Sequence, residues 1–269
     1  MSNQPSSPSQ TQDQDYELFK KKLVRLVNID LDYYKEAQMK RRITSFRDQA
    51  GINSFILFVN QLEKDPVLKK KFVDYLTINV SELFRDHALF AKLEKEFIPQ
   101  LLKRSPRLNI WSAGCSIGAE AYTLAIILDK LVPNSKHRIF GTDLDEEIIK
   151  RAATGVYSKE EVRQVEQPIL DKYFSLKDNK YHLHDSIKSR VTFKKHNLLN
   201  DPYETDIDLI CCRNVVIYFT EEAKQKLYRR FFDALKPGGI LFVGGTETIL
   251  SHQAIGFKLS QTFFYEKPL

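Results

Sequence analysis

Hydrophobic positions between Tyr16 and about Arg104 recur every three or four residues, which is the period of an amphipathic α-helix. The spacing predicts four successive helices, with buried faces formed by Leu18, Leu23 and Leu26; by Met39, Ile43 and Phe46; by Phe55, Val59 and Leu62; and by Val67, Phe72 and Leu76. Gly51 suits the end of the second helix, because glycine commonly follows the last helical residue. This part of the chain is therefore predicted to be a small bundle of four or five helices.

The pattern changes after Pro106, where short apolar runs begin to alternate with helical stretches. Strands are expected at 108–111, 138–143, 207–212, 240–243 and 262–265, and helices at 119–131, 146–153 and 221–235. Such alternation is typical of the α/β class with a mostly parallel, doubly wound, Rossmann-like sheet. Weak alternation of apolar and polar residues between 173 and 197 predicts a small antiparallel β insertion.

These changes in pattern divide the chain into four parts. Residues 1–14 are almost entirely polar and are predicted to be a disordered tail. The expected helical domain covers 15–78, a linker with a helix covers 79–104, and the α/β domain covers 105–269 with its insertion at about 173–197.

The charge is concentrated near the beginning of the chain. The net charge is +6, and Tyr16 to Thr77 holds 13 Lys and Arg residues against 8 Asp and Glu, an excess of five. A cationic module indicates an acidic partner, such as a nucleic acid, a membrane surface or an acidic protein face. The basic helix carrying Lys40, Arg41, Arg42 and Arg47 is either the docking surface for that partner or an ordinary solvated face.

The cysteine pattern is that of a reduced, cytoplasmic protein. There are three cysteines, and the neighbours Cys211 and Cys212 are poor disulfide partners for each other. We expect no signal peptide and no membrane insertion, because no apolar run approaches the roughly 18 residues that a spanning helix needs. No Cys and His spacing resembles a zinc site, so no metal is expected.

Two features at the beginning of the α/β domain point to a nucleoside ligand. Gly114 and Gly118 lie between an expected strand and helix, where a tight turn lets a ligand approach the backbone, although an ordinary strand–helix turn would look the same. Asp143 ends the second strand, where a carboxylate can bind both hydroxyls of a ribose. Asp145 suits the cap of the following helix better, which leaves Asp143 for a ligand.

A third polar segment, Cys212 to Phe219, follows the most apolar strand. It carries Arg213, Asn214 and Tyr218 at the carboxyl end of the sheet, where open α/β folds bind ligands. The stretch Asn79 to Asp86 lies just before the α/β domain and would, by itself, pass for a polar connector.

Together these motifs resemble the CheR-type chemotaxis receptor methyltransferases over residues 16 to 267. The resemblance rests on Asn79, Ser81 and Phe84-Arg85-Asp86; on Ser112-Ala-Gly-Cys-Ser with Gly118, Glu120 and Tyr122; on Cys212-Arg-Asn-Val with Ile217-Tyr-Phe219; and on Leu235-Lys-Pro-Gly-Gly and Gly244-Gly-Thr-Glu247. Departures from the usual family pattern are Ser81, Leu83, Ala119, Ala121, Thr123 and Thr246. The family has a helical domain followed by a class I S-adenosylmethionine-dependent methyltransferase domain with a mixed sheet and an antiparallel insertion.

The resemblance implies a role for each matching polar residue. The cofactor S-adenosylmethionine, with product S-adenosylhomocysteine, would be bound by Asn79, Ser81, Arg85, Gly114, Glu120, Asp143, Asn197, Leu198, Arg213 and Asn214. Of these, Glu120 would hold the methionine amino group, Asp143 the ribose hydroxyls, and Asn197 and Leu198 the adenine. Arg85 and Tyr218 would be the catalytic residues, with Tyr218 near the transferred methyl group.

The implied reaction is methylation of glutamate carboxylates on chemoreceptor cytoplasmic domains, with Lys40, Arg41, Arg42 and Arg47 as the docking residues. The insertion looks short, so we hypothesise that the enzyme does not depend on a tether at the receptor's C-terminus. Two alternatives stay open, a non-catalytic module that binds the cofactor and a nucleic-acid methyltransferase. Arg213-Asn-Val-Val, in place of Asn/Asp-Pro-Pro-aromatic, argues against nucleic acid as the acceptor.

Overall fold

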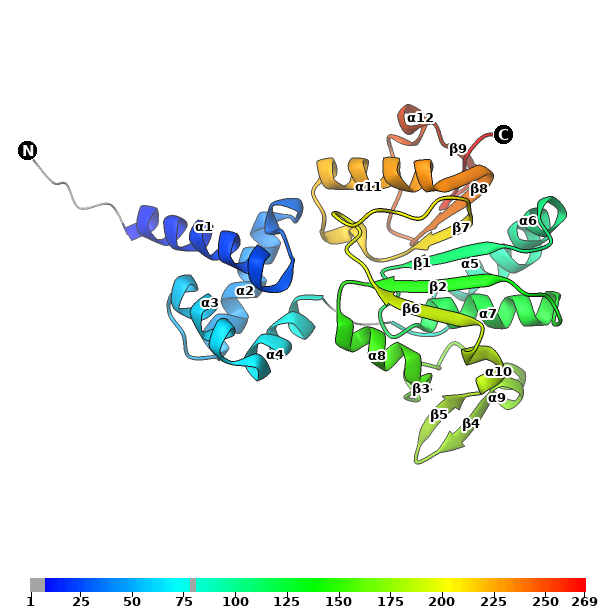
Figure 1. Ribbon diagram of the computed structural model, residues 1–269, viewed down its shortest axis with the longest axis horizontal. Helices are drawn as coiled ribbons and strands as arrows, with labels where there is room; N and C mark the ends of the chain where they lie inside the picture. The colour runs from blue at the N-terminus through cyan, green and yellow to red at the C-terminus, as the bar shows by residue number, and fades with distance from the viewer. Residues whose placement is uncertain (1–7, 78–80) are drawn as a thin grey trace, which may run out of the picture. The chain divides into compact units, whose positions relative to one another are not determined.

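The computed structural model describes residues 8–77 and 81–269, with side-chain burial from residue 14 onward. The chain forms two compact units, which are described separately (Figure 1). The first comprises Met1–Ile78 with Tyr218–Ala223, and the second comprises Asn79–Ile217 with Lys224–Leu269.

The described residues of the first unit form the expected helical bundle. Its elements are α1 Pro8–Val27, the short 3-10 helix η1 Leu31–Tyr33, α2 Glu36–Gln49, α3 Phe55–Lys64 and α4 Pro66–Thr77. The beginning of α3 is capped twice, because Ser54 accepts the N–H of Leu57 and Asp15 on α1 accepts the N–H groups of Phe55 and Ile56. These bonds fasten α1 to α3, and Gly51, with φ of 73°, follows the end of α2 as expected.

Two of the predicted apolar stripes in this unit are wrong in one position each. Leu18 is 53% exposed, and the buried face of α1 consists of Tyr16, Phe19 and Leu23. Those three residues keep the i, i+3, i+7 spacing of one helical face, and Leu18 lies on the opposite side. Val67 is 65% exposed, because it belongs to the first turn of α4 and only later residues of that helix reach the core.

The first helix begins earlier than the sequence indicated. Residues 8–14 are helical, where a disordered tail had been predicted over 1–14; residues 1–7 lie outside the described part. Proline is well tolerated in the first turn of a helix, and the polar residues that follow Pro8 include no glycine or further proline. Tyr16 and Phe19 pack in the core and stabilise the helix there, and the helix can therefore extend back through these polar residues to Pro8.

The second unit is built on a seven-stranded mixed sheet in the order β6-β2-β1-β7-β8-β10-β9. The strands are β1 Asn109–Ala113, β2 Arg138–Asp143, β6 Val191–Lys195, β7 Ile207–Cys212, β8 Leu235–Val243, β9 Lys258–Gln261 and β10 Phe264–Glu266. The five strands from β6 to β8 are parallel, whereas β10 pairs antiparallel with both β8 and β9. The carboxyl ends of β1, β2 and β7 therefore meet along one edge of the sheet.

Helices cover both faces of this sheet, with α7 and α8 on one face and α11 on the other (Figure 1). The helical elements of this part of the chain are α5 His87–Lys92, the π-helical turn η2 Leu93–Phe97, α6 Ile98–Arg104, α7 Ala119–Leu131, α8 Glu146–Thr154, α9 Gln167–Tyr173, α10 Asp185–Lys188, the 3-10 turn η3 Val216–Tyr218, α11 Glu221–Ala234 and α12 His252–Ile255. None of the described helices is long and apolar enough to cross a membrane.

Aromatic side chains fill the core on each face. Phe264 stacks between Phe97 and Phe242, with ring centroids 4.2 and 4.4 Å apart. On the other face Trp111 contacts Phe231 of α11 edge-on, and its indole N–H donates to Thr142 Oγ1 at 2.9 Å. Because Trp111 bridges β1 and β2 through that bond, the two strands whose ends carry Gly114 and Asp143 are fixed to each other.

The predicted insertion is antiparallel, but its boundaries differ from 173–197. Its small sheet has the order β3-β5-β4, from β3 Val156–Tyr157, β4 Phe174–Lys177 and β5 Lys180–Leu183. The run Val191–Lys195 instead forms β6, which pairs parallel with β2 in the main sheet. An edge strand with one buried face alternates in the same way as a strand of a small hairpin, so periodicity alone could not assign it.

Candidate functional site

The turn after β1 is shaped by close contacts that only glycine permits. Gly114 has a φ of 76°, and a Cβ there would lie 2.5 Å from Cγ2 of Val215. Gly118, at the beginning of α7, has a φ of 77°, and a Cβ there would lie 2.8 Å from the ring of Phe193. The N–H groups of Gly114 and Cys115 both donate to the carbonyl of Thr142 at 2.8 Å. The backbone therefore turns tightly here, as the sequence predicted, and runs directly against β2.

Asp143, at the end of β2, faces the same turn. Its carboxylate accepts the N–H of Ser116 at 2.8 Å and that of Asp145 at 3.1 Å. Asp145 caps α8 by accepting the N–H groups of Glu147 and Ile148, so its predicted capping role is confirmed. Burial raises the pKa of Asp143, against the lowering effect of the backbone donors. The Asp143 carboxylate thus lies at the end of β2 beside the glycine-containing turn after β1, with lone pairs that can accept further hydrogen bonds.

Asn197 and Leu198 follow β6 and are both buried. The N–H of His196 donates to the carbonyl of Asp143 at 2.8 Å, which brings this segment to the end of β2. The side chain of Asn197 accepts the N–H of Leu199 at 3.0 Å, and the carbonyl of Leu198 accepts a bond from Tyr203. The segment is therefore a fixed wall at the carboxyl edge beside Asp143.

A buried ion network joins α7 to β7. Glu120, in the first turn of α7, accepts the hydroxyl of Ser112 at 2.7 Å and lies 3.5 Å from Nη1 of Arg213. Burial raises the pKa of Glu120, and the nearby Arg213 guanidinium opposes that rise. The side chain of Arg213 is only 3% exposed, and its guanidinium lies 4.8 Å from the ring centroids of both Phe90 and Phe242.

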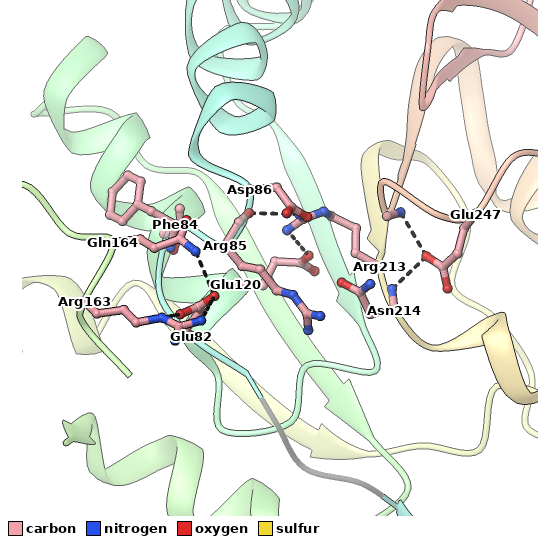
Figure 2. A network of polar contacts seen from close by, with 12 residues as sticks. Glu82, Phe84, Arg85, Asp86, Glu120, Arg163, Gln164, Arg213, Asn214 and Glu247 are labelled. Carbon is pink, nitrogen blue, oxygen red and sulfur yellow. Dashed lines mark hydrogen bonds and ion pairs between the residues drawn. The ribbon is translucent and has the colours of Figure 1, made fainter. Parts of the chain in front are cut away.

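The same guanidinium fixes the linker segment. Its Nη2 atom lies 2.7 Å from Oδ2 of Asp86 and donates to the carbonyl of Arg85 at 2.8 Å (Figure 2). Phe84 and Asp86 both adopt left-handed φ values, 54° and 60°, so the chain turns sharply on either side of Arg85. In non-glycine residues that conformation needs outside support, which the bonds to Arg213 supply.

The linker segment is also anchored to the rest of the second unit on the other side of Arg85, at Glu82 and Phe84. Glu82 accepts bonds from Arg163 at 2.6 Å and from Gln164 at 2.8 Å. The N–H of Phe84 donates to Thr123 Oγ1 on α7 at 3.0 Å. Figure 2 shows the Arg85 side chain extending away from Glu82 and toward the loop of Asn214. The segment is thus held at both ends, and Arg85 projects from between the two anchors.

The structure brings most of the predicted residues to one edge. Those of the second unit that gather along the carboxyl ends of β1, β2 and β7 are Arg85, Gly114, Glu120, Asp143, Asn197, Leu198, Arg213 and Asn214. Ser81 begins the described part of the linker just before Glu82, whereas Asn79 lies outside the described residues. Tyr218 belongs to the first unit, where its carbonyl accepts the N–H of Lys35 at 2.9 Å.

Sequence reasoning assigned no role to Glu82, Asp86 or Glu247. Glu247 is buried and accepts N–H bonds from Asn214, Val216 and Gly244. The signal available in the sequence was its place in Gly244-Gly-Thr-Glu247, directly after an apolar strand. The roles of Glu82 and Asp86 depend on partners about 80 and 127 residues away, which spacing along the chain does not reveal.

Two of the four predicted docking residues pack against their own unit. Arg42 donates from Nε to the carbonyl of Tyr75 at 2.9 Å, and its guanidinium lies 4.1 Å from that ring. Arg47 lies over the ring of Phe55, 4.3 Å from its centroid. Both side chains therefore contribute to joining α2 to its neighbouring helices.

The remaining two docking residues differ in exposure. Lys40 is half-buried, with its ammonium 4.9 Å from the centroid of Tyr16. Arg41 is exposed, and no ion pair to it occurs among the residues described from 14 onward. Successive helical residues point about 100° apart, so the run Lys40-Arg41-Arg42 cannot form one flat basic face.

Comparisons with known proteins match nearly the whole chain. Residues 14–77 match the family model described as CheR methyltransferase, all-alpha domain, and residues 79–264 match CheR methyltransferase, SAM binding domain. The chain is 40% identical to a chemotaxis protein methyltransferase of Listeria innocua, over 95% of this chain and 98% of that protein. It is 33% identical to chemotaxis protein methyltransferase 1 of Pseudomonas aeruginosa, over 87% and 90%.

Proposed function

The chain belongs to the CheR methyltransferase family, and we propose that it methylates glutamate side chains of chemoreceptor cytoplasmic domains, with S-adenosylmethionine as the cofactor. The observation that carries the proposal is the network in which the buried Arg213 pairs with Glu120 and with the more exposed Asp86. This network fastens the linker segment with Arg85 to the carboxyl edge of the sheet, where open α/β folds bind their ligands.

The residues at this edge fit an adenosine ligand with an amino acid tail. Asp143 has a carboxylate suited to ribose hydroxyls, and Asn197 with Leu198 forms a buried wall beside it. Glu120 supplies a second carboxylate, suited to an ammonium group. The space beside Gly114 would be filled by any Cβ, so the turn is built for close approach of the backbone.

When bound, S-adenosylmethionine supplies an electrophilic methyl group on a sulfonium, which is a good leaving group. The protein then needs no general base, because a free glutamate side chain has a pKa of about 4.3 and is ionised near pH 7. Its tasks are to orient the acceptor carboxylate and to remove water from it. Arg85 can do the first, since a guanidinium binds a carboxylate through two parallel hydrogen bonds.

The anchors on either side of Arg85 support an orienting role. Leu83 and Phe84 are buried, so the backbone of the linker is fixed while the side chain of Arg85 is half-exposed. A guanidinium held only by its own flexible stem would lose entropy on binding the acceptor; a fixed backbone reduces that loss. We further propose Tyr218 as the second catalytic residue, on the resemblance of Ile217-Tyr-Phe219 to the family motif.

The test is transfer of labelled methyl groups to a purified chemoreceptor cytoplasmic fragment, counted as label released by base, since only carboxyl methyl esters are released in that way. Asp143→Ala should weaken cofactor binding, whereas Arg85→Ala should lower turnover more than it lowers cofactor affinity. Arg107→Ala removes an exposed arginine outside the site and is the matched control. A normal turnover at saturating cofactor in Arg85→Ala would contradict the orienting role.

Two outcomes of this assay would favour other functions. Cofactor binding without any label on the receptor fragment would favour a non-catalytic module that binds the cofactor. Base-stable label on added nucleic acid would favour a nucleic-acid methyltransferase.

Docking is proposed to depend on Arg41, because receptor helices that display glutamates are complementary to an exposed cation. Arg41→Glu should raise the Michaelis constant for the receptor fragment and leave the cofactor dissociation constant unchanged. Arg25→Glu, an equal charge change on the exposed side of α1, is the control for net charge. If both variants raise the Michaelis constant for the receptor fragment equally, the receptor is attracted by net charge and does not dock at Arg41.

A further inference from the structure

Glu247 is a buried carboxylate that accepts hydrogen bonds from backbone N–H groups. It is 4% exposed, and it lies just after β8 in the loop that begins at Gly244. No ion pair to Glu247 occurs in the described part of the chain, although a buried carboxylate without a cation is rare in proteins. Burial raises its pKa, and backbone donors oppose the rise. Burying a carboxylate without a cation costs free energy, so Glu247 is expected to have a structural or functional role.

The three bonds to Glu247 come from two different loops. Oε2 accepts the N–H of Asn214 at 2.7 Å and that of Gly244 at 2.9 Å, and Oε1 accepts the N–H of Val216 at 3.0 Å. Asn214 and Val216 belong to the loop after β7, and Gly244 to the loop after β8. The single side chain therefore joins two adjacent strand ends on the carboxyl edge of the sheet (Figure 2).

The backbone around this carboxylate is shaped to admit it. Asn214 has a left-handed φ of 58°, which turns its N–H toward Glu247. A Cβ at Gly244 would lie 2.6 Å from Oε2 of Glu247 and 3.0 Å from the nitrogen of Asn214. The neighbouring Gly245 has open space within 4 Å, so close packing at this point is specific to Gly244.

From this geometry we infer that Glu247 is a positioning residue, which sets the conformation of the loop from Arg213 to Val216 and thereby aims Asn214 at the bound cofactor. This inference rests on the proposed function, because it takes Asn214 as part of the cofactor site. Glu247 itself makes no proposed contact with cofactor or receptor, and acts only through backbone N–H groups. A loop aimed wrongly by about 1 Å can lower turnover by about 100-fold.

The variant Glu247→Gln separates the hydrogen bonds from the shape of the side chain. A glutamine has one carbonyl oxygen, which can keep the pair of bonds to Asn214 and Gly244 or the bond to Val216, but not both. We expect Glu247→Gln to lower kcat by about 10-fold and Glu247→Ala by about 100-fold, with a smaller change in the Michaelis constant for the receptor. Thr248→Ala, an exposed change on the same loop, should leave both constants unchanged.

An amide NMR spectrum supplies a readout that does not depend on catalysis. The amide protons of Asn214, Val216 and Gly244 should resonate downfield in the wild-type protein, since each donates to a carboxylate. Glu247→Gln should move at least one of them upfield and leave the resonances of the first unit in place. Calorimetry with S-adenosylhomocysteine then tests whether the moved loop weakens cofactor binding.

These readouts keep the inference separate from the proposed function. If the wild-type protein methylates no receptor fragment, the proposed function fails, while the amide shifts and calorimetry still test Glu247. Unmoved amide resonances together with unchanged cofactor affinity in Glu247→Gln would overturn the inference. Amide shifts accompanied by normal kcat and normal affinity would also overturn it, because the loop would then not aim Asn214.

Discussion

Replacing Gly114 by alanine tests whether the turn after β1 sets the cofactor site. Two separate penalties follow from the structure. The left-handed φ of 76° costs a non-glycine residue about 1–2 kcal/mol. The new Cβ would also lie 2.5 Å from Val215, so that side chain must retreat by about 0.9 Å to reach the 3.4 Å of ordinary contact. Forced repacking of this kind costs about 1–3 kcal/mol.

Comparison with Gly155→Ala isolates the steric part of the effect. Gly155 has a φ of 63° in the same unit, and its nearest contact would be the flexible chain of Lys188, which can move. Gly155→Ala should therefore lower the free energy of unfolding by about 1–2 kcal/mol, and Gly114→Ala by about 2–5 kcal/mol. Urea unfolding followed by fluorescence of the single tryptophan, Trp111, reports on the second unit.

The same substitution should also impair methyl transfer. Val215 lies in the loop that Glu247 holds, next to Asn214, so its retreat disturbs a proposed cofactor contact. We expect Gly114→Ala to lower methyl transfer by about 100-fold, and Gly114→Ala/Val215→Ala to regain most of that loss. If Gly114→Ala binds S-adenosylhomocysteine and turns over as Gly155→Ala does, the turn does not set the site and the reasoning is refuted.

Three further predictions concern ion pairs and hydrogen bonds outside that turn. Glu82→Ala should lower the free energy of unfolding by no more than about 1 kcal/mol, because its partner Arg163 is exposed. The same change should lower kcat about 3- to 10-fold, because it loosens the linker. A kcat equal to that of the wild-type protein would show that this anchor is dispensable. Arg42→Gln should lower the free energy of unfolding of the first unit by about 1–3 kcal/mol in urea, whereas the exposed Arg41→Gln should change it by less than about 0.5 kcal/mol. A hydrogen bond from Arg138 lowers the pKa of Glu204 to about 2, from an ordinary 4.5, so its stabilising contribution is present above pH 4.5 and is lost as the pH falls toward 2. Glu204→Gln should therefore flatten the stability profile in that window, and a profile identical to wild type would contradict the assignment.

Much of the fold could be predicted from the sequence because period and spacing are local properties. The α/β architecture, the strand ending at Asp143 and the capping role of Asp145 all followed from apolar runs and the residues at their ends. The membership of β6 in the main sheet, and not in the insertion, could not be predicted. Strand pairing is decided by which partner lies alongside, and Val191 pairs with Ile139, some 50 residues earlier in the chain.

The candidate site likewise has a part that the sequence shows and a part that it does not. Glycines and acids at strand ends are visible in the sequence, because the carboxyl ends of parallel strands meet at one edge. The exposed surface was harder to predict, since charge alone gives no orientation. Arg42 and Arg47 looked equivalent to Arg41, yet each of them lies over an aromatic ring of a neighbouring helix. A guanidinium has a broad, weakly hydrated face, so an arginine in a basic run is readily used for packing.

Arg213 holds three segments of the predicted site together. Resemblance to the family predicts that it lines the methionine end of the cofactor, and its guanidinium contacts Asp86, Glu120 and the carbonyl of Arg85. Two carboxylates around one buried cation balance its charge, and the rings of Phe90 and Phe242 pack against its guanidinium. Arg213 and Glu247 therefore act in complementary ways: the cation fixes the linker that carries Arg85, and the carboxylate fixes the loop that carries Asn214. The reacting groups can then be presented by backbone that is already in place, which is the condition for rapid transfer to a weak nucleophile.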